Sequence, residues 1–300
     1  MSTLANTAPK SLAFHRFAWL PAVALPLLAF ALGSQLPVWM LAWVLAAAVY
    51  AGFKWLTFAE SEAAREATFA DVLNYLLLWP GMDAEAFLGN KPVPQPTSRE
   101  IFFAVLKFLS GLVLIFVVAR FTMSLPPLVT GWVGIVGLAL AILFGFAHFV
   151  SIAWRSLGVN AQPIMNRPLW AFSLSDFWGQ RWNLAFHDVG REYVFRPLLR
   201  RIGVIGSTFA VFLFSGIVHD LVMSVPLRRG IGLPTLYFLL QAVGVLFERS
   251  PFGKRLGLGR GLRGRAFAAA VVLLPVGLLF HSAFLQHVIL PTLHFLGAIS

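Results

Sequence analysis

Residues 101–123 read IFFAVLKFLSGLVLIFVVARFTM, and residues 128–152 read LVTGWVGIVGLALAILFGFAHFVSI. Each run exceeds the roughly 20 residues that an α-helix needs to cross the hydrocarbon core of a bilayer. The first run contains two charged residues, Lys107 and Arg120, and the second contains none. Residues 124–127 between them read SLPP, which is typical of a tight turn. The two runs therefore predict two consecutive membrane-spanning helices.

The composition of the whole chain agrees with a membrane protein. Of its 300 residues 59% are hydrophobic and 12% are charged, and the mean hydropathy is +0.80. A soluble globular chain carries about 25% charged residues. A chain of this length could not hide so much apolar surface in a soluble core, so lipid must cover part of it. The absence of cysteine excludes disulfides, thiolate nucleophiles and cysteine-based metal sites.

Hydropathy predicts an all-α, polytopic bundle of about seven or eight transmembrane spans. The seven clearest apolar segments are residues 19–32, 36–56, 101–123, 128–152, 202–225, 233–247 and 266–284. We expect a single integral membrane domain over residues 1–300. Its parts are an N-terminal hairpin at 19–56, a polar connector at 60–100, a catalytic region at 101–225 and C-terminal spans at 226–300.

The distribution of charge predicts an orientation. The chain has 23 Lys and Arg against 12 Asp and Glu, a net charge of +11. Most of these cations lie in alternate loops, and the other loops keep only Arg228 and Arg229. By the positive-inside rule the N-terminus is then cytoplasmic. The short loops suit a bacterial inner membrane, and we find no nucleic-acid motif.

Residues 214–221 read FSGIVHDL and place a histidine and an aspartate inside an apolar span. Ionisable groups in a membrane helix are costly and by default indicate function. His219 could serve as a general base, with Asp220 beside it and Ser215 one turn earlier on the same face. Gly216 would let another helix approach closely. The alternative is a histidine that only bonds to neighbouring backbone.

Residues 172–187 read FSLSDFWGQRWNLAFH, which is too polar to span a membrane and too aromatic for a solvated loop. Ser175 can cap a helix that begins at Asp176. On that helix Trp178 and Trp182 would stack one turn apart, and Asn183 and His187 would share another stripe. The alternative is an interfacial helix with an aromatic belt.

Three cations, Arg196, Arg200 and Arg201, form a cluster that follows this segment. Such a cluster could set topology by binding lipid phosphates, or it could hold a phosphate-bearing donor such as coenzyme A. The histidines at 281, 287 and 294 lack the HExxH spacing of a metal pair, so we predict no metal site.

The two polar segments together resemble the wax-synthase-like branch of the membrane-bound O-acyltransferases. That branch typically reads SLxxFWGxRWN and then SGxxHE; this chain has SLSDFWGQRWN at 173–183 and SGIVHD at 215–220. The resemblance covers roughly residues 75–222. Asp220 departs from it, because the family often has glutamate there.

The resemblance implies a helical bundle with an internal reaction chamber. It implies an O-acyltransferase in which acyl-CoA, a co-substrate rather than a bound cofactor, donates to a long-chain alcohol or related lipid. His219 and Asn183 then match the family's histidine and asparagine. We expect support from Asp220, Ser215, Trp182 and His187, and donor binding by Arg181, Arg196, Arg200 and Arg201.

The chemistry is consistent with these roles. A base that removes the hydroxyl proton makes the oxygen a better nucleophile for a thioester. The resulting oxyanion needs a hydrogen-bond donor, which the uncharged amide of Asn183 can supply. A transporter or flippase for an amphipathic lipid, with His219, Asp220 and Asn183 in a polar pathway, is the alternative. A non-catalytic, lipid-binding member of the same fold is a third reading.

Overall fold

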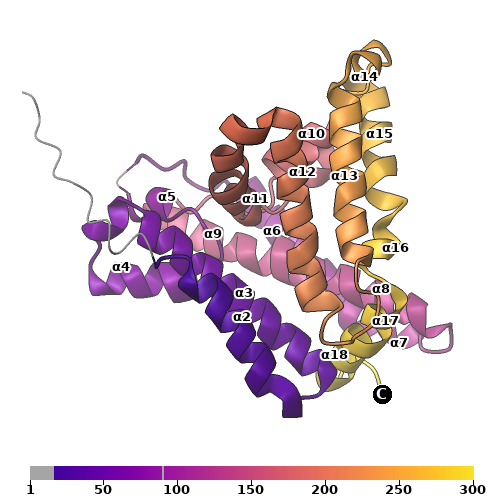
Figure 1. Ribbon diagram of the computed structural model, residues 1–300. Helices are drawn as coiled ribbons and strands as arrows, with labels where there is room; N and C mark the ends of the chain where they lie inside the picture. The colour runs from indigo at the N-terminus through magenta and orange to yellow at the C-terminus, as the bar shows by residue number, and fades with distance from the viewer. Residues whose placement is uncertain (1–16, 90) are drawn as a thin grey trace, which may run out of the picture.

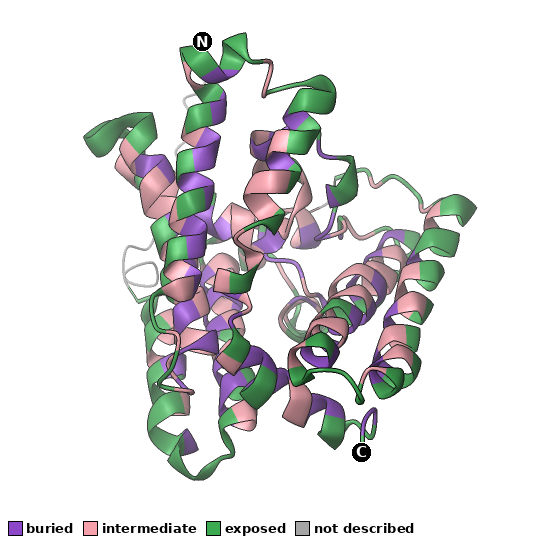
Figure 2. Ribbon diagram, turned by 90° about the vertical axis from the view of Figure 1, so that its right-hand side faces the viewer, coloured by how far each residue is buried: buried purple, intermediate pink, exposed green. Residues whose placement is uncertain are grey.

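A computed structural model describes residues 17–89 and 91–300, and within these ranges every regular element is helical (Figure 1). This confirms the all-α class predicted from the sequence. Many large apolar residues are exposed. Exposed residues lie on the outer faces of the helices, whereas buried residues lie where helices meet (Figure 2). Phe102, for example, is 61% exposed on a helix that sequence analysis assigns to the membrane. Such surfaces are suited to contact with lipid.

The N-terminal hairpin consists of α2 (Leu20–Leu32) and α3 (Val38–Glu60), which lie side by side (Figure 1). Their close approach depends on Gly52, where an added Cβ would lie 2.4 Å from the Cα atom of Ala22. Lys54 of α3 is buried, and its ammonium group donates to the carbonyl oxygen of Gly81 and lies over the Tyr75 ring. These contacts tie the hairpin to the connector that follows it.

The connector contains α4 (Phe69–Leu73), a π-helical turn at Asn74–Leu78 and α5 (Ala84–Leu88). Two long helices come next. One runs through α6 (Ser98–Val113) to α7 (Ala119–Phe121), and the other through α8 (Pro127–Leu138) to α9 (Ala147–Ser156). Each contains a wider π-helical stretch, at Leu114–Val118 and Ala139–Phe146.

A short helix, α10 (Leu174–Asp176), continues as a π-helical turn at Phe177–Arg181. Then α11 (Leu184–Gly190) leads through a π-helical turn at Arg191–Phe195 into α12 (Arg196–Met223). Gly203 interrupts α12 with φ of 68° and ψ of −177°, a conformation available to glycine.

The C-terminal part begins with α13 (Leu233–Arg249), which packs against α12 (Figure 1). It continues with α14 (Pro251–Arg255), α15 (Gly261–Leu273), α16 (Val276–Leu279), α17 (Ser282–Phe284), a π-helical turn at Leu285–Ile289 and α18 (Leu290–Phe295).

Five helices in the described ranges are long and apolar enough to cross a membrane, fewer than the seven or eight predicted. They are Val38–Glu60, Ser98–Phe121, Pro127–Ser156, Leu184–Met223 and Gly261–Leu279. The other two predicted spans correspond to α2, with 13 residues, and α13, with 17. At 1.5 Å per residue, α2 extends only about 20 Å, short of a hydrocarbon core of about 30 Å.

The predicted fifth span, residues 202–225, corresponds to the part of α12 that follows the kink at Gly203. Helical structure begins earlier, at Leu184, inside the segment that the sequence marks as too polar to span. The π-helical turn at Arg191–Phe195 changes the hydrogen-bond pattern and lets Pro197 enter the first turn of α12. Residues 1–16, which hold the predicted cytoplasmic N-terminus, lie outside the described residues.

Candidate active site

His219 lies on α12, and its ring makes two informative contacts. Its Nδ1 atom is 2.7 Å from the backbone carbonyl oxygen of Ser215. A carbonyl oxygen only accepts, so Nδ1 carries the proton in the neutral ring and Nε2 carries the lone pair. The ring also packs against the Phe238 ring of α13, with 4.6 Å between the two ring centroids. The imidazole is therefore fixed in orientation, with the basic nitrogen directed away from its own helix turn.

Asp220 faces α13 rather than the neighbouring histidine. Its carboxylate accepts from the backbone amide of Gly232 at 2.8 Å and from that of Thr235 at 3.0 Å, and it also accepts from the Thr235 hydroxyl. These donors belong to the first turn of α13 and the residue before it, where helix amides lack partners of their own. Asp220 thus caps α13 and fixes its start against α12.

Gly216 allows this arrangement. A Cβ atom added at Gly216 would lie 2.6 Å from the Cα atom of Thr235, far inside van der Waals contact. The backbones of α12 and α13 can approach this closely only at a residue without a side chain. The sequence-based expectation that Gly216 permits a close helix approach is thus met by α13.

The segment before Asn183 begins differently from the prediction. Ser173, not Ser175, is the capping residue: its hydroxyl accepts from the Asp176 amide at 3.0 Å, and the helix begins at Leu174. Ser173 has the extended backbone that an N-cap requires. The amide of Ser175 is already inside the helix and donates to Glu248 of α13.

The two tryptophans do not stack on each other, contrary to the prediction. The helix ends at Arg181, so Trp182 has an extended backbone and leaves the helical stripe. Its ring stacks on Phe177 with 5.4 Å between centroids. Trp178 instead points to α13, where its indole nitrogen donates to Gln241 at 3.2 Å and its ring lies 5.7 Å from that of Phe238.

Asn183 is the N-cap of α11 and has a left-handed backbone, with φ of 43° and ψ of 62°. Its Oδ1 atom accepts from the Phe186 amide at 3.5 Å, so the side-chain nitrogen is left to donate elsewhere. The predicted helix from Asp176 does not continue to His187, because it ends at Arg181 and a new helix starts at Leu184. The His187 amide donates to the Asn183 carbonyl oxygen at 3.0 Å, so the two residues lie one turn apart at the start of α11. The His187 side chain bonds to Asp188, at 3.0 Å.

Phe238 connects the two motifs, because its ring contacts both His219 and Trp178. Within the described residues no hydrogen bond joins Asn183 directly to His219. The sequence analysis missed residues of α13 that contact the motif segment, among them Phe238, Gln241 and Glu248. A signal was present, since Gln241 and Glu248 are polar and lie seven residues apart in an apolar helix, and both are buried.

The four predicted donor-binding cations have different surroundings. Arg181 is partly buried and bonds to Asp176, with 2.5 Å between Nε and Oδ2, and to the carbonyl oxygen of Arg167. Arg196 pairs with Glu192, one turn earlier on the exposed surface. Arg200 and Arg201, in the first turns of α12, are both exposed.

A second serine–histidine pair lies at the far end of α12 and is not suited to nucleophilic catalysis. Ser224 and His281 are both buried, with 3.2 Å between Oγ and Nε2. Nδ1 of His281 accepts from the Phe284 amide, so Nε2 carries the proton and donates to the serine. This histidine cannot take the serine proton, and its role is to cap α17.

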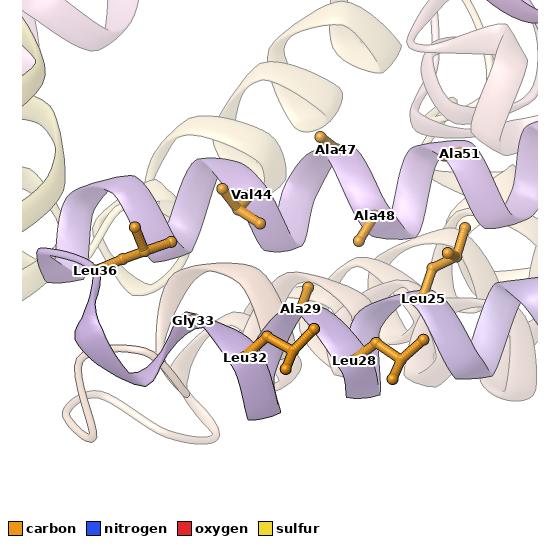
Figure 3. Close-up of a pocket in the computed structure, with 10 residues that line it drawn as sticks. All are labelled: Leu25, Leu28, Ala29, Leu32, Gly33, Leu36, Val44, Ala47, Ala48 and Ala51. Carbon is orange, nitrogen blue, oxygen red and sulfur yellow. The ribbon is translucent and has the colours of Figure 1, made fainter.

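A pocket of about 530 Å³ lies between α2 and α3 (Figure 3). Leucines of α2 and alanines of α3 line it: Leu25, Leu28, Leu32, Ala47, Ala48 and Ala51. None of the residues predicted for the site lines this pocket. The side chains that line it are all apolar, as on a surface suited to contact with lipid.

Comparison with known proteins gives a family match over the segment that contains the candidate site. Residues 161–240 match the model of the membrane bound O-acyl transferase family. This stretch contains Asn183, His219 and Phe238. A long-chain-alcohol O-fatty-acyltransferase of Simmondsia chinensis is 28% identical over 200 residues, which are 62% of this chain and 55% of that protein.

Two Arabidopsis thaliana proteins are also similar. Acyl-CoA--sterol O-acyltransferase 1 is 36% identical over 95 residues, 27% of this chain and 28% of that protein. Probable long-chain-alcohol O-fatty-acyltransferase 9 is 31% identical over 151 residues, 44% of this chain and 42% of that protein. The chain thus spans about half the length of the Simmondsia relative and less of these two. These matches confirm the resemblance to the membrane-bound O-acyltransferase family and to its wax-synthase-like relatives.

Proposed function

We propose that this protein transfers an acyl group from acyl-CoA to the hydroxyl of a long-chain alcohol or related lipid, with His219 as the general base. The observation that carries this proposal is the bond from His219 Nδ1 to the Ser215 carbonyl oxygen, at 2.7 Å. It leaves Nε2 as a proton acceptor in an apolar helix. The similarity to long-chain-alcohol acyltransferases supports the choice of acceptor.

The proposed reaction has two steps. Nε2 of His219 takes the hydroxyl proton while the oxygen attacks the thioester carbonyl carbon, which forms a tetrahedral oxyanion. The carbon–sulfur bond then breaks, and the imidazolium returns its proton to the coenzyme A sulfur. The products are an ester and free coenzyme A. No covalent enzyme intermediate is needed, which suits a chain without cysteine.

Asn183 supplies the oxyanion contact in this proposal. Its Oδ1 atom is held by the Phe186 amide, and its side-chain nitrogen can therefore donate to a developing negative charge. An uncharged donor does not lower the basicity of His219. An internal chamber between the two motifs would exclude water, which otherwise hydrolyses the thioester.

The donor and the supporting residues complete the proposal. Arg200 and Arg201 are exposed cations that could meet the phosphates of coenzyme A, with Arg181 and Arg196 nearby in the chain. Trp182 and His187 flank Asn183, and Ser215 and Asp220 flank His219. We also propose a bacterial inner membrane, which the short loops suit, and a cytoplasmic N-terminus, which the charge distribution predicts.

The test is acyl transfer by membranes that contain the protein. Labelled palmitoyl-CoA is supplied with a panel of long-chain alcohols, sterols and diacylglycerol. We expect ester from at least one acceptor, and a loss of at least about a hundredfold in His219→Ala. His294→Ala is the matched control, since His294 is exposed on α18. Ester formed equally by His219→Ala would reject His219 as the base.

A further inference from the structure

Glu248 is a buried carboxylate near the end of α13, with 3% of its surface exposed. Burying a carboxylate is costly unless hydrogen bonds replace its water. Both of its recorded hydrogen bonds go to backbone amides: Oε2 accepts from Leu174 at 2.5 Å, and Oε1 accepts from Ser175 at 3.1 Å. The charge of Glu248 is therefore directed at the beginning of the segment that contains the FWG motif.

The partner of Glu248 is a helix N-terminus. Leu174–Arg181 is one short helical segment, and its first amides have no acceptors within the helix. The positive end of the helix dipole adds to the attraction of a carboxylate. Arg249 strengthens the same junction, because its Nε atom donates to the Ser175 hydroxyl at 2.9 Å. A charged clamp thus joins the end of α13 to the start of the motif.

The same face of α13 also contacts the rest of the site. Gln241 accepts from Trp178, and Phe238 contacts both Trp178 and His219. Gly244 lies between Gln241 and Glu248 in the same helix. A Cβ added at Gly244 would lie 2.8 Å from the Leu174 side chain, so Leu174 packs directly on α13. The spacing of these residues keeps them on one stripe of an α-helix.

We propose that Glu248 is a positioning residue: it holds the segment Leu174–Arg181, and through it Asn183, in register with His219. Glu248 is ten residues from Phe238 in the same helix, or about 15 Å along the axis. It is therefore remote from the reacting atoms and acts only through the motif segment. The segment is short and irregular, so its position depends on anchors outside itself.

The test compares Glu248→Gln with the wild-type protein in two independent measurements. The first is hydrogen–deuterium exchange of the purified protein. In Glu248→Gln an amide group faces two backbone donors that need acceptors, so exchange in residues 174–183 should rise at least about tenfold. Exchange in residues 207–223 of α12 should not change. Glu66→Gln is the matched control, because it removes the same charge from an exposed position.

The second measurement rests on the proposed acyl transfer. A misplacement of about 1 Å can lower the rate about a hundredfold. We expect kcat to fall by roughly ten- to a hundredfold while KM for palmitoyl-CoA stays within about twofold. Glu248→Asp, which keeps the charge but retracts it, should retain more kcat than Glu248→Gln. A purely structural role would lower the amount of folded protein and leave kcat per folded molecule unchanged.

The two measurements fail differently. If the wild-type protein transfers no acyl group, the proposed function fails while the exchange result still decides the positioning role. Unchanged exchange in residues 174–183 of Glu248→Gln, or an equal rise throughout the protein, would overturn the inference. If Glu248→Gln does not fold, Glu248→Asp is measured in the same way, and unchanged exchange in the motif would again overturn it.

Discussion

The carboxylate of Asp220 accepts a hydrogen bond from the Thr235 amide at 3.0 Å, across the interface of α12 and α13. Asp220 follows His219 in the chain, yet the three recorded hydrogen bonds of its side chain all go to the start of α13. The acid next to the candidate base therefore sets the position of a helix. The ring of Phe238, one turn further along that helix, then limits where the imidazole of His219 can lie.

Replacing Asp220 by alanine should destabilise the fold. Two backbone amides and a hydroxyl at the start of α13 would lose their acceptor, which costs about 2–4 kcal/mol. Thermal unfolding of the purified protein in detergent measures this effect, with Glu66→Ala as the control. Loss of acyl transfer at unchanged thermal stability would contradict the capping role and assign Asp220 to the chemistry.

Replacing Gly216 by alanine should separate α12 from α13. The added methyl group would lie 2.6 Å from the Thr235 Cα atom, so backbone must move, at a cost of about 1–3 kcal/mol. Gly277→Ala is the matched control, because nothing lies within 4 Å of a Cβ at that position. The two variants are compared by thermal unfolding. Equal stability of the two would show that the helices adjust without strain.

The stability contributed by Glu85 should depend on pH. Hydrogen bonds from the Ala63 amide and the Ser61 hydroxyl hold the pKa of this carboxyl below its ordinary value. The ionised group therefore stabilises the connector above the unfolded pKa, about 4.3, and this contribution is lost as pH falls through the lower folded pKa.

The measurement is the melting temperature of the wild-type protein and of Glu85→Gln at pH 7 and pH 3. We expect the wild-type advantage to be at most roughly 2 °C at pH 7, because Glu85 is exposed, and to be smaller at pH 3. An advantage of the same size at both pH values would show that the neutral acid makes the same contacts.

The helical membrane class could be predicted from the sequence because it depends on summed hydropathy, to which every residue contributes. The number of spans could not be predicted as well, because apolar stretches such as α2 and α13 form helices shorter than a bilayer. The helical structure that precedes the fifth span, from Leu184 to the kink at Gly203, was also missed. It depends on local backbone geometry at Pro197 and Gly203 that hydropathy does not encode.

Some features of the candidate site could likewise be predicted from the sequence, and others could not. His219, Asn183 and Gly216 could be selected because a polar or small residue in an apolar setting is visible in one dimension. The contacts of Trp178 with Gln241, and of Leu174 with Glu248, join residues that are more than 60 positions apart in the chain. Such pairs are fixed by packing, and a single sequence gives no direct sign of them. The direction of Trp182 also depends on a local feature, because the helix ends at Arg181 and Trp182 has an extended backbone.

The left-handed backbone of Asn183 has a consequence for mutagenesis. Asparagine tolerates this conformation better than most residues, whereas alanine is strained there and glycine is not. Replacement by alanine would thus combine two effects at this position: it removes the amide group, and it strains the backbone. Glycine is the appropriate reference residue, because it deletes the amide and keeps the chain in place. The comparison of Asn183→Gly with Asn183→Ala therefore separates the effect of losing the amide group from the effect of straining the backbone.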